Sequence, residues 1–569
     1  MQVAKIKKKN KNGLLFVYVK KKQYLCSDYG FLCSLSISRL RNVMRNLLLI
    51  IFVSLSLLLS AQEKVMVIAD PHVLATSLVE EGDAFDAMMN QQRKMIHLSQ
   101  VAFTSLVDTA LLYKPAFVLI PGDLTKDGEL ESHNFVAQQI KRLNDAGIKT
   151  LVIPGNHDID GKAFAYRGSE KVAVDALTDA EWENKYAFVY EQAVAKDPLS
   201  HSYVAEPISG VTILGLDASH STGEGSLSDA TLSWVLSQAD AASQKGNMVI
   251  AMCHWQVLEH VDEGEFILES ALIQDAEMIR DSLMAHNVRL LLTGHMHINS
   301  ISTYRDTLTN TGDSIVEIST GSPITYPSPY RWLTISDDRS TISVETDYLT
   351  ALPNYGDLNT YGCDWMREHT QILMPTLALR WFEVTEYIFA ELLLYAGVSE
   401  QMLPMFLAIL LPQTDEEKNL LFNKYLAQPI IDLYLLHSEA NEPANPQTDS
   451  LAQAMYDAIG ALILEMTGVA LESSPEIQQM LALYMIEISK MCIQSLVEDR
   501  TYWTSAYYSD CTDDLQITLT INESQTMTAL ENINPISVKG LYDILGRRVT
   551  GEQLNKGQIY IQDGLKVQY

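Results

Sequence analysis

Positive charge is scarce in this 569-residue chain, and much of it lies at one end. The sequence has 41 Lys and Arg residues against 71 Asp and Glu residues, for a formal net charge of −30. Residues 1–61 hold 11 of the basic residues and one acid, so the rest of the chain carries 30 basic and 70 acidic residues, a net charge of −40. Because such a surface repels polyphosphate backbones, we expect no bulk nucleic acid as a partner unless a basic groove lies within the acidic field.

Long apolar runs are also lacking. The most prominent one, residues 47–59, has 13 residues, whereas a membrane-spanning helix needs about 20. Arg45 precedes this run and Ser60-Ala61 follows it, which is typical of a secretory signal peptide. We therefore expect residues 44–61 to be a signal peptide cleaved after Ala61.

The first 43 residues are basic and show no periodic pattern. We expect them to be a gene-model extension ahead of a start at Met44. The alternative is an unusually long n-region of the signal peptide.

Cysteine is scarce as well, with six in the chain. Cys26 and Cys33 precede the signal peptide, and no cysteine directly follows its apolar run, so nothing indicates a lipoprotein. In an oxidising compartment, two pairings of the later cysteines stay open, Cys492–Cys511 or Cys363–Cys511.

Apolar runs alternate with helical patterns through the first half of the chain. This βαβ rhythm predicts an α/β fold whose parallel strands are joined by crossover helices. Later segments alternate apolar and polar residues, which favours antiparallel strands. The parallel strands are expected at 64–70, 116–120, 150–155, 211–217, 248–254 and 288–293, helices at 88–112, 129–145, 227–243 and 268–285, and antiparallel strands at 314–319, 331–336 and 341–346.

The pattern changes near residue 355. From 366 to about 500 the apolar residues fall at helical spacing, with breaks at Pro412 and around 441–446, so we expect four to six helices. The apolar segment Met402–Leu411 is too short to span a bilayer, and we expect a buried helix there. From 515 the pattern becomes β again.

Polar motifs close or follow five of the predicted strands. Each motif alone is compatible with a turn, a helix cap or a buried core histidine. Five in sequence, each at the carboxyl end of a buried strand, instead favour one shared site at the rim of a sheet. The candidate metal ligands are Asp70, His72, Asp123, Asn156, His254, His295 and His297.

Carboxylate and amide oxygens mixed with imidazoles suit Mn, Fe or Zn. Seven ligands exceed what one ion takes from a protein, so they suit two divalent or trivalent ions that share a bridging carboxylate. Two such ions polarise a phosphoryl oxygen and hold a hydroxide, which predicts hydrolysis of a phosphate ester.

The motif series, from Asp70-x-His72 through Gly155-Asn156-His157-Asp158 to Gly294-His295-x-His297, resembles the calcineurin-like metallophosphoesterase superfamily over about residues 64–350. The resemblance implies a two-sheet α/β sandwich flanked by helices. It also implies that His157 protonates the leaving oxygen or steadies the phosphoryl charge, with Asp158 as the candidate to orient it. In the implied ligand sets, Asp70, His72 and His297 hold the first metal, Asn156, His254 and His295 hold the second, and Asp123 bridges both.

Two departures from the family pattern leave the substrate open. Cys253 stands where many members have the first of two histidines, and we expect it to be a buried structural residue facing away from the metals. Residues 160–200 and 321–331 have no universal counterpart in the family.

The substrate is expected to be a small-molecule or lipid phosphate ester. The stretch Gly122–Gly128 is similar to cyclic-nucleotide phosphodiesterases, and exported members with added helices include monoesterases and sphingomyelinase-like enzymes. A non-catalytic surface binding protein on the same fold is the alternative from another class, and the intact ligand set argues against it.

The C-terminal segments 540–549, 554–561 and 564–567 are short predicted strands with glycine at the turns. They resemble the sorting domain of type IX secretion substrates, which implies that machinery as a partner and a cell-surface or extracellular location. The alternatives are a small structural β module and a periplasmic location.

The predicted segments of the whole chain are thus an extension over 1–43, a signal peptide over 44–61, a metallophosphoesterase domain over 62–350, a helical domain over 351–514 and a β-rich sorting domain over 515–569.

Overall fold

The computed structural model divides the chain into two units, residues 1–61 and 62–569, and all described residues lie in the second. The predicted extension and signal peptide therefore lie outside the described residues, as do Cys492, Cys511 and most of the predicted sorting domain. Cys363 is a free cysteine. The structure describes residues 62–219, 225–260, 272–305, 314–395, 397–439, 446–467, 508–510, 515–520, 541–543, 559–562 and 565–568.

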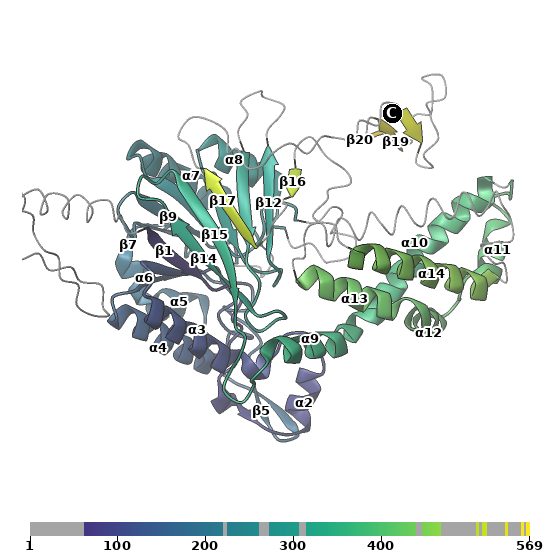
Figure 1. Ribbon diagram of the computed structural model, residues 1–569, viewed down its shortest axis with the longest axis horizontal. Coiled ribbons are helices and arrows are strands. Elements are labelled where there is room, and N and C mark those ends of the chain that lie inside the picture. The colour runs from purple at the N-terminus through teal and green to yellow at the C-terminus, as the bar shows by residue number, and fades with distance from the viewer. Residues whose placement is uncertain are drawn as a thin grey trace, which may run out of the picture. The chain divides into compact units, whose positions relative to one another are not determined.

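One sheet has six strands and combines parallel and antiparallel pairs (Figure 1). Its parallel part contains short apolar strands, and all four residues of the central one, Phe117–Ile120, are buried. Because both faces of such a strand are buried, its sequence is apolar at every position. In spatial order the strands are β17 (Gln516–Thr520), β15 (Thr341–Tyr348), β14 (Pro329–Ile335), β1 (Glu63–Val67), β3 (Phe117–Ile120) and β4 (Lys149–Val152).

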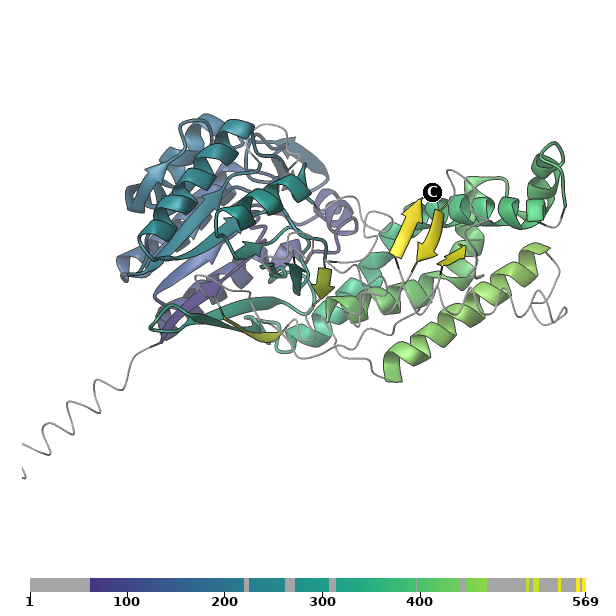
Figure 2. The same cartoon turned by 90° about the horizontal axis from the view of Figure 1, so that it is seen from above.

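A second sheet has eight strands and is parallel at its centre. Helices lie on the outer faces of the sheets (Figures 1 and 2), among them α3 (Ser99–Tyr113), α4 (Leu130–Asp145), α7 (Asp229–Gln244) and α8 (Ala276–Ala285). The order of strands is β16 (Tyr508–Asp510), β12 (Ser300–Arg305), β13 (Ser314–Ser319), β11 (Leu290–Thr293), β10 (Met248–Cys253), β9 (Val211–Leu216), β8 (Tyr203–Ala205) and β7 (Ala193–Lys196).

The main core joins the two sheets. Met66 of β1, Ile250 of β10 and Leu292 of β11 belong to one buried cluster. Side chains alternate along β10, so Cys253 lies in a separate cluster with residues of α7, including Val235. The predicted two-sheet sandwich flanked by helices is confirmed, and Cys253 is buried as expected.

The helical region follows, with its own apolar core around Met366, Phe382 and Phe422. Its first helix begins with a side-chain cap, because the Asp357 carboxylate accepts a hydrogen bond from the Thr360 amide. The described helices are α9 (Leu358–His369), α10 (Met374–Tyr395), α11 (Leu403–Leu410), α12 (Asp415–Tyr425), α13 (Ala427–Ser438) and α14 (Pro446–Thr467). Among the helices in the described part of the chain, none combines the length and apolarity needed to cross a membrane.

Two predicted helices differ from the structure. The helix predicted over 88–112 is interrupted, since α2 (Asp83–Met89) ends early and α3 begins at Ser99. Between them the amide of Met95 donates to the carbonyl of Ile324 (2.7 Å) and so leaves the helical ladder for a tertiary partner. The prediction that Met402–Leu411 forms a buried helix was wrong in its burial, because α11 has no buried residue and Ile409 is 68% exposed.

Two late strands return to the sandwich. β16 pairs antiparallel with β12, and β17 pairs antiparallel with β15. These strands come from segments that the sequence assigns to the helical and sorting domains. Smaller sheets are formed by β2 (Val79–Glu80), β5 (Phe164–Arg167) and β6 (Glu170–Ala173), and by β18 (Leu541–Asp543), β19 (Ile559–Gln562) and β20 (Leu565–Gln568).

Candidate metal centre

The candidate ligands follow the carboxyl ends of strands from both sheets. Asp70 and His72 follow β1, Asp123 follows β3, and Asn156 follows β4. The eight-stranded sheet supplies the others, with His254 directly after β10 and both His295 and His297 after β11. The sandwich thus brings together seven polar side chains that are as much as 227 positions apart in the sequence.

One group of ligand atoms comes from Asp70, His72, Asp123 and His297, whose candidate ligand atoms all lie within 4.8 Å of one another. The Nε2 atoms of His72 and His297 are 2.9 Å apart. His72 Nε2 is 3.3 Å from Asp123 Oδ2, and His297 Nε2 is 3.6 Å from Asp70 Oδ1. Four donors directed at one small volume fit a single metal ion.

A second group lies on the other side of Asp123. Asn156 Oδ1 is 3.0 Å from His254 Nε2 and 3.1 Å from His295 Nδ1, and the two imidazole nitrogens are 3.2 Å apart. Asp123 Oδ2 is 3.5 Å from His254 Nε2. The same Asp123 oxygen therefore adjoins both groups, which is the place of a bridging ligand.

The protonation of the ligands fits cations with nitrogen and oxygen donors. Burial lowers the pKa values of His72 and His297 well below the usual range, so both rings offer a lone pair at neutral pH. Burial raises the pKa of Asp70 to about 8. Burial also opposes the charge on His254, but the carboxylates of Asp123 and Asp70 outweigh it and raise that pKa to about 9. Without metal, the interacting pair of Asp70 and His254 holds protons that supply positive charge in place of metal ions.

A further contact orients His254. Its Nδ1 donates to the carbonyl oxygen of Pro121 (2.9 Å), which turns Nε2 toward the ligand cluster. This hydrogen bond to backbone is the usual device that fixes a metal-binding imidazole.

Close backbone approaches build the turns that carry the ligands. A Cβ on Gly155 would lie 2.2 Å from Asp123 Oδ1, and one on Gly294 would lie 2.4 Å from Asp70 Oδ2. Glycine is therefore required at both positions for space alone. Five of the ligand residues also adopt left-handed backbone angles, which cost about 1–3 kcal/mol each and mark functional sites; they are Asp70, His72, Asp123, His295 and His297.

His157 lies beside this cluster, with its ring centroid 5.0 Å from that of His72. Its Nδ1 is hydrogen-bonded to Asp127 Oδ1 (3.1 Å), and its backbone amide donates to Asp123 Oδ1 (3.0 Å). The side chain of Asp158 accepts instead from the backbone amides of Leu124, Thr125 and Gly155, at 2.9–3.0 Å. Asp158 thus fixes the turns, and Asp127 is the carboxylate that orients the His157 ring.

Sequence reasoning missed Asp127 and Lys94. For Asp127 a signal existed, since it lies four residues after Asp123 in the same glycine-bounded stretch. Lys94 lies in the break between α2 and α3, and its Nζ is 3.3 Å from His72 Nε2. Burial lowers its pKa to about 8, so the ammonium stays mainly charged at neutral pH. No motif surrounds Lys94, and the continuous helix predicted over 88–112 gave no reason to expect a loop at this position.

The two-sheet sandwich thus carries a cluster of carboxylate, amide and imidazole groups at its strand ends, four of which could hold a metal ion. Residues 63–299 match the family model described as calcineurin-like phosphoesterase. This part of the chain is therefore a calcineurin-like metallophosphoesterase domain.

Individual relatives are distant. A protein from Rhodococcus erythropolis named "Probable cyclic nucleotide phosphodiesterase" is 23% identical over 236 residues, which cover 41% of this chain and 66% of that protein. The chain thus matches slightly less than two thirds of that relative's length. Among solved structures, a dimetal phosphatase from Danio rerio has 13% identity and a TM-score of 0.36, covering 50% of this chain and 95% of that one. A purple acid phosphatase from yellow lupin has 11% identity and a TM-score of 0.31, covering 51% and 52%.

Proposed function

We propose that this chain is a two-metal phosphoesterase that hydrolyses phosphate esters. The observation that carries the proposal is the position of Asp123 Oδ2, which is 3.3 Å from His72 Nε2 and 3.5 Å from His254 Nε2. Asp70, His72 and His297 would hold one ion, and Asn156, His254 and His295 the other. Mn, Fe and Zn all suit this donor set.

Two such ions, when bound, supply a hydroxide nucleophile at neutral pH and polarise the phosphoryl oxygens. The protein's own contribution is to hold the ligands in place. Asp123 accepts a hydrogen bond from the His157 amide, and both oxygens of Asp70 accept from the His295 amide (2.9 and 3.1 Å). These bonds tie the carboxylates to turns of both sheets before any ion enters.

His157 supplies the proton for the departing oxygen. Its Nδ1 faces the Asp127 carboxylate, so the second ring nitrogen is the one available to the substrate. The Asp127 carboxylate accepts a hydrogen bond from Nδ1 and so fixes the orientation of the ring. About one third of the His157 side chain is exposed, so a leaving group can reach it.

The proposal is tested with purified protein beginning at Gln62, stripped of metal and reloaded with Mn²⁺, Zn²⁺ or Fe²⁺. Hydrolysis is measured for a phosphate monoester, an open phosphodiester and a cyclic nucleotide. Metal-dependent release of product from at least one substrate is expected. Absence of turnover with every metal, together with ligand binding by the loaded protein, would favour the alternative of a surface binding protein.

A phosphodiester is the second candidate substrate class. It is favoured by the name of the Rhodococcus relative and by the similarity of Gly122–Gly128 to cyclic-nucleotide phosphodiesterases. A cyclic-nucleotide or lipid diester would be cleaved by the same groups, because the bound metals and His157 would act on the phosphoryl group rather than on the remainder of the ester.

We also propose that the enzyme is exported and that its C-terminal segment is read by type IX secretion machinery. The support comes from the signal-like pattern over 44–61 and from the short glycine-bounded strands at the C-terminus. Two of these strands, β19 and β20, pair antiparallel, with Tyr560 opposite Val567.

A further inference from the structure

The break between α2 and α3 places a lysine at the metal centre. Lys94 Nζ lies 3.3 Å from His72 Nε2, one of the candidate ligand atoms. Its side chain is partly exposed, so it lies at the rim of the site rather than within the core. The next residue, Met95, anchors the backbone through the 2.7 Å hydrogen bond to Ile324, so the loop has a fixed course.

A cation at this position needs an anionic partner once metal is present. A metal ion on His72 takes up the nitrogen lone pair that now faces the Lys94 ammonium. Like charges a few ångströms apart then repel each other, unless an anion lies between or beside them. Asp70 and Asp123 are committed to the metals. Asp127, the third carboxylate whose charge acts on Lys94, is already paired with Lys126 and His157. A substrate phosphoryl oxygen is therefore left as the partner of matching charge.

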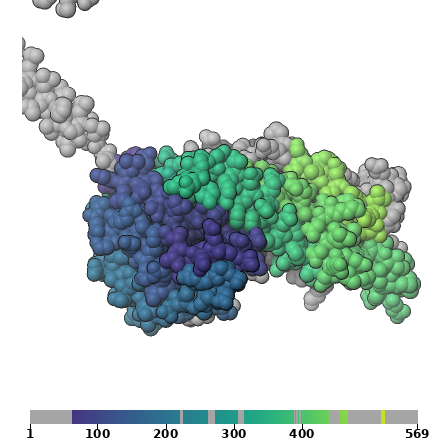
Figure 3. All heavy atoms as spheres, turned by 90° about the horizontal axis from the view of Figure 1, so that it is seen from below, coloured from purple at the N-terminus to yellow at the C-terminus, as the bar shows by residue number. Residues whose placement is uncertain are grey.

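The helical region holds the same loop from outside. The guanidinium of Arg93 donates to the hydroxyl of Tyr434 in α13 and lies 5.0 Å from the centre of its ring. His97, at the other end of the loop, is hydrogen-bonded to the Tyr361 hydroxyl of α9 (2.8 Å). Figure 3 shows the early segment in purple beside the green of these helices. The loop is therefore fixed at both sides of Lys94.

We propose that Lys94 binds a non-bridging oxygen of the substrate's phosphate group, and that α9 and α13 hold it there through His97 and Arg93. The inference rests on the proposed phosphoesterase function and names a residue that recognises its substrate. The bound phosphate would accept a charged hydrogen bond from Nζ in addition to its contacts with the metals.

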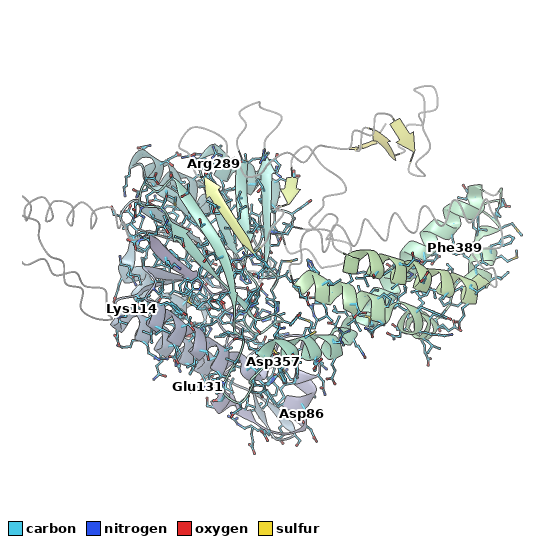
Figure 4. All side chains as sticks on the ribbon, viewed as in Figure 1. Asp86, Lys114, Glu131, Arg289, Asp357 and Phe389 are labelled. Carbon is cyan, nitrogen blue, oxygen red and sulfur yellow. The ribbon has the colours of Figure 1, made fainter. Side chains whose placement is uncertain are left out.

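The experiment uses orthophosphate, the product common to phosphate monoesters, as the probe. Its dissociation constant is measured by calorimetry with the manganese-loaded chain beginning at Gln62, for wild type, Lys94→Gln and Lys94→Arg. Lys114→Gln is the matched control, because Lys114 is an exposed lysine at the carboxyl end of α3, the opposite end of that helix from Lys94 (Figure 4). Metal content is determined for every sample.

Lys94→Gln is expected to weaken orthophosphate binding about 10- to 100-fold, the usual value of one charged hydrogen bond, with metal content unchanged. Lys94→Arg should retain most of the affinity, and Lys114→Gln should match wild type. Unchanged affinity in Lys94→Gln would overturn the inference. It would not affect the proposed phosphoesterase function if the wild type is active. Weaker binding that only follows loss of metal would also overturn it. A wild type that neither hydrolyses esters nor binds orthophosphate would remove the proposed function and this inference together.

Discussion

Asp123 is the residue that lies between the two groups of candidate ligands. One of its oxygens lies near a histidine of each group, and the other accepts the His157 amide. Burial raises the pKa of Asp123, but the positive charges of the neighbouring histidines, chiefly His254, lower it by more. The net pKa lies well below the usual range, so the carboxylate is ionised at neutral pH. A single side chain thus adjoins both groups of candidate ligands and the turn that carries His157.

Asp123→Asn should reduce metal content from close to two ions per chain and abolish turnover, because a neutral amide is a poor bridge between two cations. Elemental analysis and a hydrolysis assay measure the two effects. Asp86→Asn, an exposed position on α2 labelled in Figure 4, serves as the control and should behave as wild type. One ion per wild-type chain with full activity would contradict the two-metal proposal.

His157→Ala should lower kcat by about 10²–10⁴, the range for lost acid–base assistance, with metal retained. The loss should be smaller for nitrophenyl esters, whose leaving group needs no proton. Asp127→Asn should give a weaker version of the same pattern, since Asp127 acts only by orienting the His157 ring. Equal losses for good and poor leaving groups would argue against an acid role.

Metal affinity should rise with pH. The raised pKa values of Asp70, about 8, and of His254, about 9, belong to an interacting pair that holds at least one proton at pH 7 in the metal-free protein, and a metal must displace it. His72 and His297, whose pKa values are lowered by burial, release none. The apparent affinity should therefore increase up to about tenfold per pH unit for each proton released, and level off above these pKa values. Calorimetry at pH 7 in buffers of different ionisation enthalpy counts the protons, and a count of zero would contradict this assignment.

The sequence places most of the candidate ligands at the ends of predicted strands, and there is a physical reason why they come together. Asp70, Asp123 and His254 each end or follow an apolar run, and parallel strands bring their carboxyl ends to one rim. Lys94 could not be found in this way, because it reaches the rim from a loop whose course depends on Ile324, more than 200 residues away. A local pattern contains no information about such a partner.

At the scale of elements, the turns after the strands determine the site as much as the strands do. The turn after β4 brings the backbone of Gly155 against Asp123, and the carboxylate of Asp158 fixes it by accepting the Gly155 amide (2.9 Å). The segment 160–200 adds support on one side, since Leu177 donates its amide to Gly128 (2.9 Å) in the loop that carries Asp127.

Gly155→Ala should displace Asp123, because the new methyl group would meet its carboxylate at 2.2 Å and its backbone nitrogen at 2.3 Å. We expect lower metal content and a loss of activity comparable to that of Asp123→Asn. Gly356→Ala is the control, since a Cβ there meets nothing within 4 Å. Elemental analysis of both variants tests the expectation, and normal metal content in Gly155→Ala would show that the turn can relax.

The helices show that a local sequence pattern can predict where a helix ends but not whether the helix is buried. Breaks near Pro412 and residue 441 correctly separate α11 from α12 and α13 from α14. The same apolar composition that marks α11 as a helix does not fix its burial, because burial depends on which elements pack against it. Its exposed Met405 and Ile409 could not be foreseen from the segment itself.

At the scale of the whole molecule, the proposed sorting segment is separable from the catalytic domain. Deleting residues 522–569 leaves β17 and every candidate ligand in place. Activity and metal content should therefore stay close to wild type, whereas in a host with type IX secretion the truncated enzyme should accumulate in the periplasm. Fractionation and assay of cells making either form measure both effects. Truncated enzyme outside the cell at full-length levels would reject the sorting role, and loss of activity would indicate a structural β module.

The strands β16 and β17 are synthesised long after β12 and β15, the strands with which they pair. A ribosome has made all seven candidate ligands by His297, yet the strands that cover β12 and β15 emerge only around residues 508–520. In the interval both sheets present bare edges, whose unpaired amides and carbonyls readily recruit strands from other chains. The nascent protein is thus most prone to aggregate after its chemistry is encoded and before its last edge strands arrive.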